Sequence, residues 1–428
     1  MNADVLVVGA GPAGLAAAVE LRKLGAGRVL VVDRDEAAGG IPRHSAHTGF
    51  GARDLRRVLT GPGYARRYAD AAAAAGADIR LGTTVTGWDG APTGGGPQRV
   101  TLTSDAGVQS VDAGAVLLAT GCRERPRTAR LVPGDRPPGV MTTGELQRRI
   151  YLAGQWLPGR ALIVGAEHVS FSAMVTLAHA GAQVLALVTG RPRHTSYAGF
   201  ALAASWRWHV PVWPSTVVGQ VTGRGRLEGV QLADTRTGVT RFVPCDVVVF
   251  TGDWIPDHEL ARAAGLAVDP GTRGPAVDTA LETSVPGVFA AGNLVHAAET
   301  ADVAALGGRH AARGIAEFLR CEGDGGRRAA GRRGPAPEPV RLPVTAEPPL
   351  RWVAPNLIRA GGPAPPRGRF ILRSDAFARL ARLEVWQDGR RLATGLSYGM
   401  KPDRPVRLSA SWTGRADPGG GPVTVRLA

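Results

Sequence analysis

Three glycines near the N-terminus are spaced for binding a dinucleotide. Gly9, Gly11 and Gly14 fit the pattern G-x-G-x-x-G in "VLVVGAGPAGLAAAVEL", after an apolar strand and at the start of a helix. The first glycine allows the tight turn, the second lets the backbone approach a pyrophosphate, and the third allows close packing of the helix on the strand. Asp33 ends the next apolar segment about 20 residues on, where a carboxylate can accept hydrogen bonds from ribose hydroxyls. The combination predicts dinucleotide binding.

A second copy of this layout lies in "ALIVGAEHVSFSAMVTLAHAGAQVLALV". Gly165 keeps the place of the first glycine, but Glu167 replaces the second and Ser170 the third. A glutamate adds bulk and like charge where the backbone must approach a pyrophosphate. In a partly buried site such repulsion costs on the order of a few kcal/mol. The second copy is therefore predicted to be a weakened nucleotide site.

The strand that follows the second copy ends in "VTGRPRH", which offers no acid for a ribose. Arg191 and Arg193 could instead meet a 2′-phosphate, as in NADP-type sites. Two interpretations follow. In the favoured one the pocket is degenerate and the domain serves as a scaffold or interface. In the other, NADPH binds in a shifted pose with Glu167 turned outward or capping the helix, where a carboxylate suits the helix dipole and could replace the missing phosphate.

The elements that position these motifs divide the chain into segments. Residues 1–125 and 255–321 are expected to form one dinucleotide-binding domain, since "AVLLATG" and "TSVPGVFAAGN" complete a sheet begun at the N-terminus. Residues 126–254 read as a second, inserted nucleotide-type domain. Residues 322–341 form a Gly/Arg/Pro-rich linker that cannot pack a core. Residues 342–428 alternate apolar and polar positions between turn signals such as "QDGR", which predicts a small all-β domain.

Several segments resemble a known superfamily. "EAAGGIP", "AVLLATG" and "TSVPGVFAAGN" are similar to the flavin-contacting segments of flavoproteins with two dinucleotide-binding domains, the glutathione reductase and thioredoxin reductase superfamily. "GGIPRHSAHTGFG", "ATGCRERPRTARLVPGDRPPGVMTTGELQ" and "FAAGNLVHAAETAD" resemble more closely a bacterial group of FAD-dependent oxidoreductases associated with glycerol-3-phosphate dehydrogenases. They also resemble the alpha-type subunits of opine oxidase and hydrogen cyanide synthase.

The resemblance implies an α/β fold, with an FAD-binding Rossmann-like domain of the glutathione reductase type, an inserted second Rossmann-like domain and a C-terminal all-β domain. In that superfamily a Gly-Asp pair approaches the ribityl chain. Here the pair is Gly292-Asn293, and asparagine keeps an acceptor oxygen. The helix that begins at Thr300–Ala301 is expected to face the flavin pyrimidine. The resemblance and the motifs together imply FAD contacts from Gly9, Gly11, Gly14, Asp33, Arg34, Gly40, Ile41, Val85, Thr120, Gly121, Gly292, Asn293, Thr300 and Ala301.

The residue types present also exclude some chemistry. Disulfide reductases of this superfamily carry a redox-active cysteine pair directly after the segment that corresponds to "EAAGGIP". Here residues 41–51 contain no cysteine, and Ser45 stands where relatives tend to have one. A dithiol relay needs two thiols within reach of the flavin. Cys122, Cys245 and Cys321 are widely spaced and predict neither a disulfide framework nor a metal site.

Two histidines lie in the same stretch. If the superfamily layout holds, His44 and His47 lie near the isoalloxazine ring. His47 matches a histidine of relatives and could shuttle a proton during hydride transfer. The alternative is that both histidines only bind the loop or the FAD phosphates. His47 is the candidate catalytic residue.

Composition excludes several partner classes. The net charge of +15 comes almost entirely from scattered arginines, with lysine only at Lys23 and Lys401, and no basic helix or aromatic-interleaved groove predicts nucleic-acid binding. No apolar run is long enough for a transmembrane segment. A cytoplasmic protein is expected.

The sequence therefore predicts an FAD-dependent oxidoreductase that transfers two electrons as a hydride through a non-covalent flavin, without a redox-active disulfide. FAD is the expected cofactor, and the use of NADP or NAD is left open. The alternative is a non-catalytic or electron-relay subunit of a heteromeric amino-acid, opine or polyol-phosphate dehydrogenase. The expected partner is a small-molecule substrate or a dehydrogenase subunit, in a homodimer or a heteromer.

Overall fold

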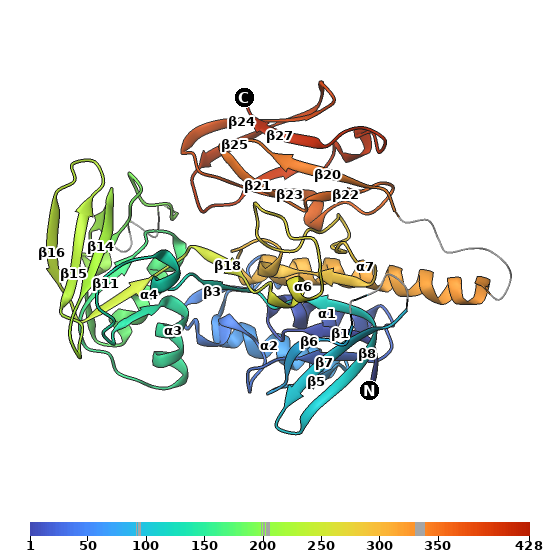
Figure 1. The fold of residues 1–428 in the computed structure, drawn as a ribbon, viewed down its shortest axis with the longest axis horizontal. Coiled ribbons are helices and arrows are strands. Elements are labelled where there is room, and N and C mark those ends of the chain that lie inside the picture. The colour runs from blue at the N-terminus through green and yellow to red at the C-terminus, as the bar shows by residue number, and fades with distance from the viewer. Residues whose placement is uncertain (91, 93–95, 198, 200–201, 203–205, 330–338) are drawn as a thin grey trace. The chain divides into compact units, whose positions relative to one another are not determined.

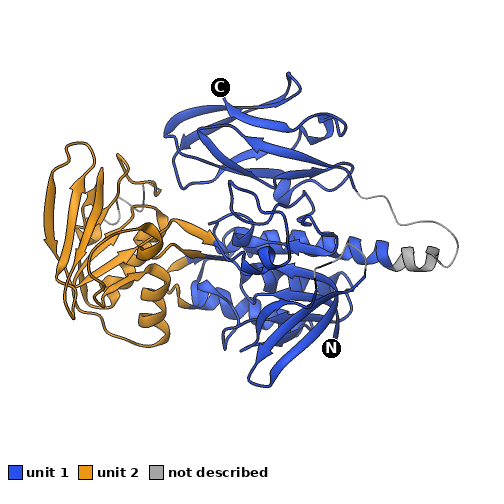
Figure 2. Cartoon of the chain, in the orientation of Figure 1, with its two compact units in different colours: residues 1–43, 49–122, 256–428 blue, residues 44–48, 123–255 orange. Residues whose placement is uncertain are grey.

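The computed structural model describes residues 1–428 except 91, 93–95, 198, 200–201, 203–205 and 330–338 (Figure 1). The chain forms two compact units, and the second is inserted into the first (Figure 2). Unit 1 comprises Met1–Arg43, Gly49–Cys122 and Pro256–Ala428. Unit 2 comprises His44–Thr48 and Arg123–Ile255.

The α/β sheet of unit 1 begins with two apolar segments that each read VLVV. Strands β1 and β2 pair in parallel with Val5 opposite Val29, and β1 also pairs in parallel with the second half of β8. The order is β5-β2-β1-β8-β7-β6, with β19 also paired with β8. Parallel strands buried on both faces read as continuous apolar runs, which explains these segments. The strands are β1 (Asn2–Val8), β2 (Val29–Val32), β5 (Asp78–Arg80), β6 (Thr84–Trp88), β7 (Gln98–Ser104), β8 (Gly107–Leu118) and β19 (Val288–Ala290).

Helices α1 (Pro12–Lys23), α2 (Gly61–Ala74) and α7 (Ala301–Ala329) pack on this sheet or on one another. Small residues let α1 and α7 approach closely, since a Cβ on Gly308 would lie 1.9 Å from the carbonyl oxygen of Ala13. The short elements of this part are η1 (Ile41–His44), β3 (Thr48–Phe50), β4 (Leu59–Thr60), α6 (Glu259–Ala263) and η4 (Gly292–Leu294).

Unit 2 repeats the parallel arrangement in the order β10-β17-β11-β12-β13 and adds an antiparallel sheet, β14-β15-β16. Strands β9 (Cys122–Glu124) and β18 (Trp254–Pro256), at its two chain connections, pair with each other. The other elements are η2 (Arg127–Arg130), β10 (Val140–Thr142), α3 (Thr143–Gln147), η3 (Arg148–Leu152), β11 (Gly159–Val164), α4 (His168–His179), β12 (Ala182–Val188), β13 (Val212–Trp213), β14 (Thr216–Thr222), β15 (Gly229–Asp234), β16 (Thr240–Pro244) and β17 (Val247–Phe250).

The C-terminal strands form two facing sheets, β22-β20-β27-β24-β25 and β21-β23-β26. Their shared core includes Phe370 and Trp412, whose rings stack with centroids 5.1 Å apart. The "QDGR" turn joins β24 to β25, with Asp388 and Gly389 at positive φ as a tight hairpin requires. The elements are β20 (Arg341–Ala346), β21 (Leu350–Ala354), β22 (Leu357–Arg359), η5 (Pro366–Gly368), β23 (Arg369–Ser374), β24 (Ala378–Gln387), β25 (Arg390–Met400), β26 (Val406–Ser409), η6 (Thr413–Arg415) and β27 (Val423–Leu427).

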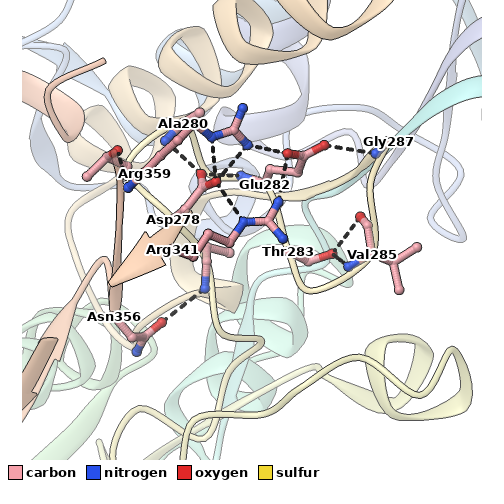
Figure 3. A network of polar contacts seen from close by, with 11 residues as sticks. Asp278, Ala280, Glu282, Thr283, Val285, Gly287, Arg341, Asn356 and Arg359 are labelled. Carbon is pink, nitrogen blue, oxygen red and sulfur yellow. Dashed lines mark hydrogen bonds and ion pairs between the residues drawn. The ribbon is translucent and has the colours of Figure 1, made fainter. Parts of the chain in front are cut away.

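This β region has its own core and is grouped with the rest of unit 1 by its contacts. A buried ionic network joins the start of the β region to the α/β part of unit 1 (Figure 3). Asp278 and Glu282, 0% and 3% exposed, accept hydrogen bonds from Arg341 and Arg359 at the start of the β region. Arg341 Nη2 lies 2.9 Å from Glu282 Oε2, and Arg359 Nη2 lies 2.6 Å from Asp278 Oδ2.

The expected linker, residues 322–341, needs a correction. Helix α7 continues to Ala329, so the first part of this segment is helical. The sequence there still contains Glu, Arg and Ala, which favour helix despite the intervening glycines. Residues 330–338 of the expected linker lie outside the described residues, and β20 begins at Arg341.

Candidate functional site

The first glycine motif lies at the carboxyl end of β1, where α1 begins. Gly9 has φ +109, and a Cβ there would lie 2.5 Å from the carbonyl oxygen of Ala119. A Cβ on Gly14 would lie 1.9 Å from the carbonyl oxygen of Gly9. A Cβ on Gly11, in contrast, would meet no atom within 4 Å. Gly9 and Gly14 are therefore required for packing, and Gly11 faces open space beside the helix N-terminus, which suits the approach of a pyrophosphate.

Asp33 directly follows β2 and organises this turn. Its Oδ2 accepts a hydrogen bond from the backbone N–H of Ala10 at 2.6 Å, and its Oδ1 accepts one from Asp35 at 2.9 Å. Each carboxylate oxygen keeps acceptor capacity for a ribose hydroxyl. Gly40, at φ +61, lies against Gly11, because a Cβ there would be 3.0 Å from the Gly11 Cα. The "EAAGGIP" segment thus lies beside the first glycine motif. The neighbouring Ile41 is exposed.

Other residues beside the first glycine motif come from the carboxyl ends of β2 and β8 and from the start of β6. The backbone N–H of Thr83, two residues before Val85, donates to the carbonyl of Asp33 at 2.9 Å. Thr120 Oγ1 donates to the carbonyl of Asp257 at 2.8 Å, and the Asp257 N–H donates to the carbonyl of Gly121 at 3.0 Å. The exposed Arg34 guanidinium lies 4.0 Å from the Asp257 carboxylate.

The third segment follows β19 and leads into α7. Gly292, at φ +72, packs against α1, since a Cβ there would lie 2.8 Å from the Cβ of Ala13. For Asn293 the sequence predicts a contact with a ribityl chain. Its Oδ1 accepts from the Glu299 N–H at 2.8 Å and its Nδ2 donates to the Glu299 carbonyl at 3.2 Å. The asparagine therefore closes the loop 293–299, and only the remaining acceptor capacity of its oxygen is available for a ligand.

Helix α7 begins at Ala301, directly after Thr300. The Thr300 carbonyl accepts from the N–H groups of Val303 and Ala304 at 3.0 Å, and its Oγ1 accepts from the Arg53 guanidinium at 2.9 Å. Arg53 also forms an ion pair with Asp302 at 3.9 Å. Sequence reasoning missed Arg53, because an exposed arginine in a loop belongs to no motif.

His44, Ser45 and His47 belong to unit 2. Ser45, 5% exposed, donates to Gln147 Oε1 at 3.3 Å, and His44 is 2% exposed. These contacts explain why residues 44–48 belong to unit 2. The sequence instead predicts them to be part of the first domain. His47 Nδ1 lies 2.9 Å from the carbonyl oxygen of Thr48, so Nδ1 carries the proton and Nε2 is the acceptor in the neutral ring. A catalytic role of His47 stays a prediction.

In the second glycine motif, Glu167 caps α4. Gly165 has φ +143 and keeps the turn. Glu167 is the N-cap residue and forms a capping box with Ser170: its carboxylate accepts from the Ser170 N–H, and Ser170 Oγ accepts from the Glu167 N–H at 3.2 Å. Thr251 Oγ1 also donates to Glu167 Oε1. The carboxylate therefore occupies the helix N-terminus that would bind a pyrophosphate.

Two more charged residues surround this carboxylate. Glu124, 7% exposed, accepts from the N–H groups of Gly144 at 2.9 Å and Gly252 at 3.1 Å. Burial raises the pKa of the Glu124 carboxyl to about 7, and the charge of Glu167 acts in the same direction. Arg130 donates to the carbonyl groups of Thr251 and Gly252 at 3.0 and 2.9 Å. Both residues lie in "GCRERPRTAR", a segment whose resemblance to relatives is visible in the sequence but whose role is not.

The arginines expected at this site lie in a segment that passes beside the turn. The N–H of Thr195 donates to the carbonyl of Ala166 at 3.0 Å, and the N–H of Ser215 donates to the carbonyl of Arg191 at 2.8 Å. Arg191 is half-buried and Arg193 is exposed. Both stay candidates for a 2′-phosphate.

The fold contains two mainly parallel α/β sheets, each with a strand–turn–helix motif. The family model described as "Pyridine nucleotide-disulphide oxidoreductase" matches residues 3–308, and the chain belongs to this family. Over the described helices, none is both long and apolar enough to cross a membrane.

Curated relatives are similar along much of the chain. An opine oxidase subunit of Agrobacterium tumefaciens (strain Ach5) is 30% identical over 319 residues, covering 68% of this chain and 61% of that protein. The alpha subunit of the sarcosine oxidase of Corynebacterium sp. (strain P-1) is 30% identical over 375 residues, covering 83% of this chain and 36% of that protein. The chain therefore spans less than two thirds of the length of these relatives. The solved thioredoxin reductase of T. acidophilum shares the fold, with a TM-score of 0.61 and 23% identity over 74% of this chain and 98% of that one.

Proposed function

We propose that this chain is an FAD-dependent oxidoreductase whose flavin is bound non-covalently by unit 1 and is not reduced through the second nucleotide motif. The observation that carries the proposal is the contrast between the two helix N-termini. Gly11 leaves the start of α1 open, whereas Glu167 places a carboxylate at the start of α4.

The residues of unit 1 fit FAD. The N-terminus of α1 offers backbone N–H groups and the positive end of a helix dipole to the pyrophosphate. Asp33 accepts from the adenosine ribose, and Thr120–Gly121 and Gly292–Asn293 border the rest of the cofactor. Bound FAD would supply two-electron chemistry, taking up a hydride and later passing its electrons on. The chain supplies binding, orientation and a proton-carrying group, for which His47 is the candidate.

The electron donor is proposed to be an organic substrate or a partner subunit. Residues 41–51 contain no cysteine, so a dithiol relay like that of a disulfide reductase is absent from this segment. The relatives are named as subunits of opine and sarcosine oxidases. This favours, as the second candidate function, an electron-relay subunit of a heteromeric amino-acid or opine dehydrogenase.

Anaerobic stopped-flow mixing tests the proposal. The purified yellow protein is mixed with NADPH and then with NADH while the flavin absorbance is followed, and dithionite serves as the control for a reducible flavin. We expect no rapid bleaching by either nucleotide and full bleaching by dithionite. Rapid bleaching by NADPH would show that the second motif works despite Glu167, and a colourless protein that does not take up FAD would overturn the flavin assignment itself.

A further inference from the structure

A pocket in unit 1 lies between the C-terminal β region and the loop that follows "TSVPGVFAAGN". The space along its lining, open solvent included, is about 540 Å³. One wall is formed by Gly292–Glu299 and the first turns of α7, and the other by residues 354–371 of the β region.

Two arginines line this pocket, and two more lie near them. Arg367 and Arg369 line it, and partial burial followed by the like charges of Arg407, Arg369 and Arg53 lowers the pKa of Arg367. Among the described residues, no carboxylate lies within 4.0 Å of Arg367, Arg369 or Arg407, whereas Arg53 has Asp302 at 3.9 Å. The charge of Asp302 opposes the mutual repulsion at Arg367 only in part, since the pKa of Arg367 is still lowered. Like charges held close together attract an anion, and planar guanidinium groups suit a carboxylate or a phosphate.

The carboxylate that lines the pocket does not cancel this charge. Glu299 forms an ion pair with Arg373 at 3.1 Å, and the two side chains are 5% and 6% exposed. Arg373 also donates to the Ala298 carbonyl at 2.6 Å, which fixes the pair in place. The Glu299–Arg373 pair is therefore neutral as a unit, and the excess positive charge remains at Arg367, Arg369 and Arg407.

Other lining residues are apolar, and one buried polar atom among them has no partner. Val295, Val303, Pro355 and Ile371 contribute aliphatic surface. His296 also lines the pocket, and its Nδ1 is buried without a hydrogen-bond partner. Burial, and then the charge of Arg373, lower the pKa of His296 to about 3, so the ring is neutral. A buried polar atom without a partner is costly, and a ligand group could satisfy it.

We propose that this pocket binds an organic carboxylate, with its head group at Arg367 and Arg369, its apolar body against Val303 and Ile371, and a polar group within reach of His296. The apolar interior favours an organic acid over inorganic phosphate, which would leave that surface unfilled. The inference concerns binding alone, but the pocket shares Gly292 and Asn293 with the residues proposed to border FAD, so it is tested on the FAD-loaded protein.

Titration calorimetry of the FAD-loaded, full-length protein with hexanoate, hexan-1-ol and inorganic phosphate tests this inference. We expect hexanoate to bind, hexanol to bind more weakly because it lacks the charge, and phosphate to bind more weakly because it lacks the apolar body. Arg367→Gln and Arg369→Gln are each expected to weaken hexanoate binding by about tenfold or more, the usual effect of losing a charge-assisted hydrogen bond.

Arg379→Gln is the matched control, since Arg379 is an exposed arginine on β24 outside the pocket. It should leave hexanoate affinity unchanged. Arg407→Gln provides a second variant if either pocket arginine proves necessary for folding, which thermal unfolding would reveal. Absence of hexanoate binding, equal binding by Arg369→Gln, or equal affinities for phosphate and hexanoate would each overturn the proposal.

Discussion

The two glycine motifs share one backbone frame. In the first, the Gly9 N–H donates to the carbonyl of Val32 at 2.8 Å, and in the second the Gly165 N–H donates to that of Val188 at 2.7 Å. Both glycines have positive φ. The turn that joins strand to helix is thus the same, and its preservation alone does not tell whether a nucleotide binds.

The difference lies in the first turn of the helix. Gly11 is the N-cap of α1 and Gly14 is its third residue; Glu167 and Ser170 hold the same two places in α4. These are the two positions of a capping box. The positions of the open Gly11 and the packed Gly14 in the first copy therefore form a closed reciprocal cap in the second.

A third position completes the cap. The residue after the central strand is Ala119 in unit 1 and Thr251 in unit 2, and each N–H donates to the neighbouring strand, to Val8 at 2.8 Å and to Val164 at 3.0 Å. The Thr251 hydroxyl also lies 2.7 Å from Ser170 Oγ. A helix N-terminus binds whichever anion is available. Three side chains thus cap the helix N-terminus of the second motif without changing the fold.

Gly11→Glu should convert the first motif into a likeness of the second. The new carboxylate would lie at the N-terminus of α1 and repel the pyrophosphate, so we expect FAD affinity to fall by about a thousandfold, equivalent to ~4 kcal/mol. Flavin absorbance of the purified variant measures the effect. Gly414→Glu is the control, because Gly414 in the β region also has no atom within 4 Å of a Cβ. If the Gly11→Glu protein contained as much flavin as the control, a carboxylate at this helix N-terminus would not be what separates the two motifs.

Glu124→Gln tests whether the buried carboxyl of Glu124, near the Glu167 cap of α4, makes the stability of the protein depend on pH. The raised pKa of about 7 means that the folded state holds a proton which the unfolded chain releases near pH 4.5. Stability should therefore fall as the pH rises between those values, by about 3 kcal/mol. Urea unfolding at pH 5 and pH 8 measures this slope. The Glu124→Gln variant should lose it, and Glu228→Gln, at an exposed position, should keep it. An unchanged slope in Glu124→Gln would assign the pH dependence to another group.

Glu167→Gly should reopen the second motif. Glycine is tolerated at an N-cap at a cost of a few tenths of a kcal/mol, roughly, so the helix should persist. Removal of the carboxylate is expected to raise NADPH affinity by about tenfold, or ~1.4 kcal/mol, with Arg191 and Arg193 as candidates for the 2′-phosphate. Quenching of protein fluorescence measures binding. Equal affinities in the wild type and the variant would mean that Glu167 is not what closes the site.

Much of the fold could be predicted because it rests on local patterns. The VLVV segments, the glycine spacing and the "QDGR" hairpin each determine a strand, a turn or a helix start within about ten residues. The two mainly parallel sheets, each with a strand–turn–helix motif, followed from these signals. The end of α7 and the attachment of the β region did not, because the latter depends on Asp278 and Glu282 meeting arginines some 60 to 80 residues away in sequence.

In the candidate sites, too, the residues that belong to a local sequence pattern could be predicted, and those brought together by folding could not. Glu167 is conspicuous in the sequence because it breaks a glycine pattern, and capping is one of the outcomes that the pattern allows. The partners that close the cap, Ser170 and Thr251, come from separate elements, and only the folded chain brings their hydroxyls together. Arg367, Arg369 and His296 form no pattern in the sequence, because their pocket is assembled from two distant segments.

Ser170→Ala is the smallest expected effect and measures the cap itself. Ser170 is 0% exposed, and alanine would remove the acceptor for the Glu167 N–H while leaving the helix backbone unchanged. We expect a loss of about 1 kcal/mol in the free energy of unfolding, typical of a lost cap. A double-mutant cycle with Glu167→Gln separates capping from the simple loss of a buried hydroxyl. A coupling energy of about 0.5 kcal/mol or more supports the reciprocal cap, whereas additive effects would mean that the serine and the glutamate stabilise α4 independently.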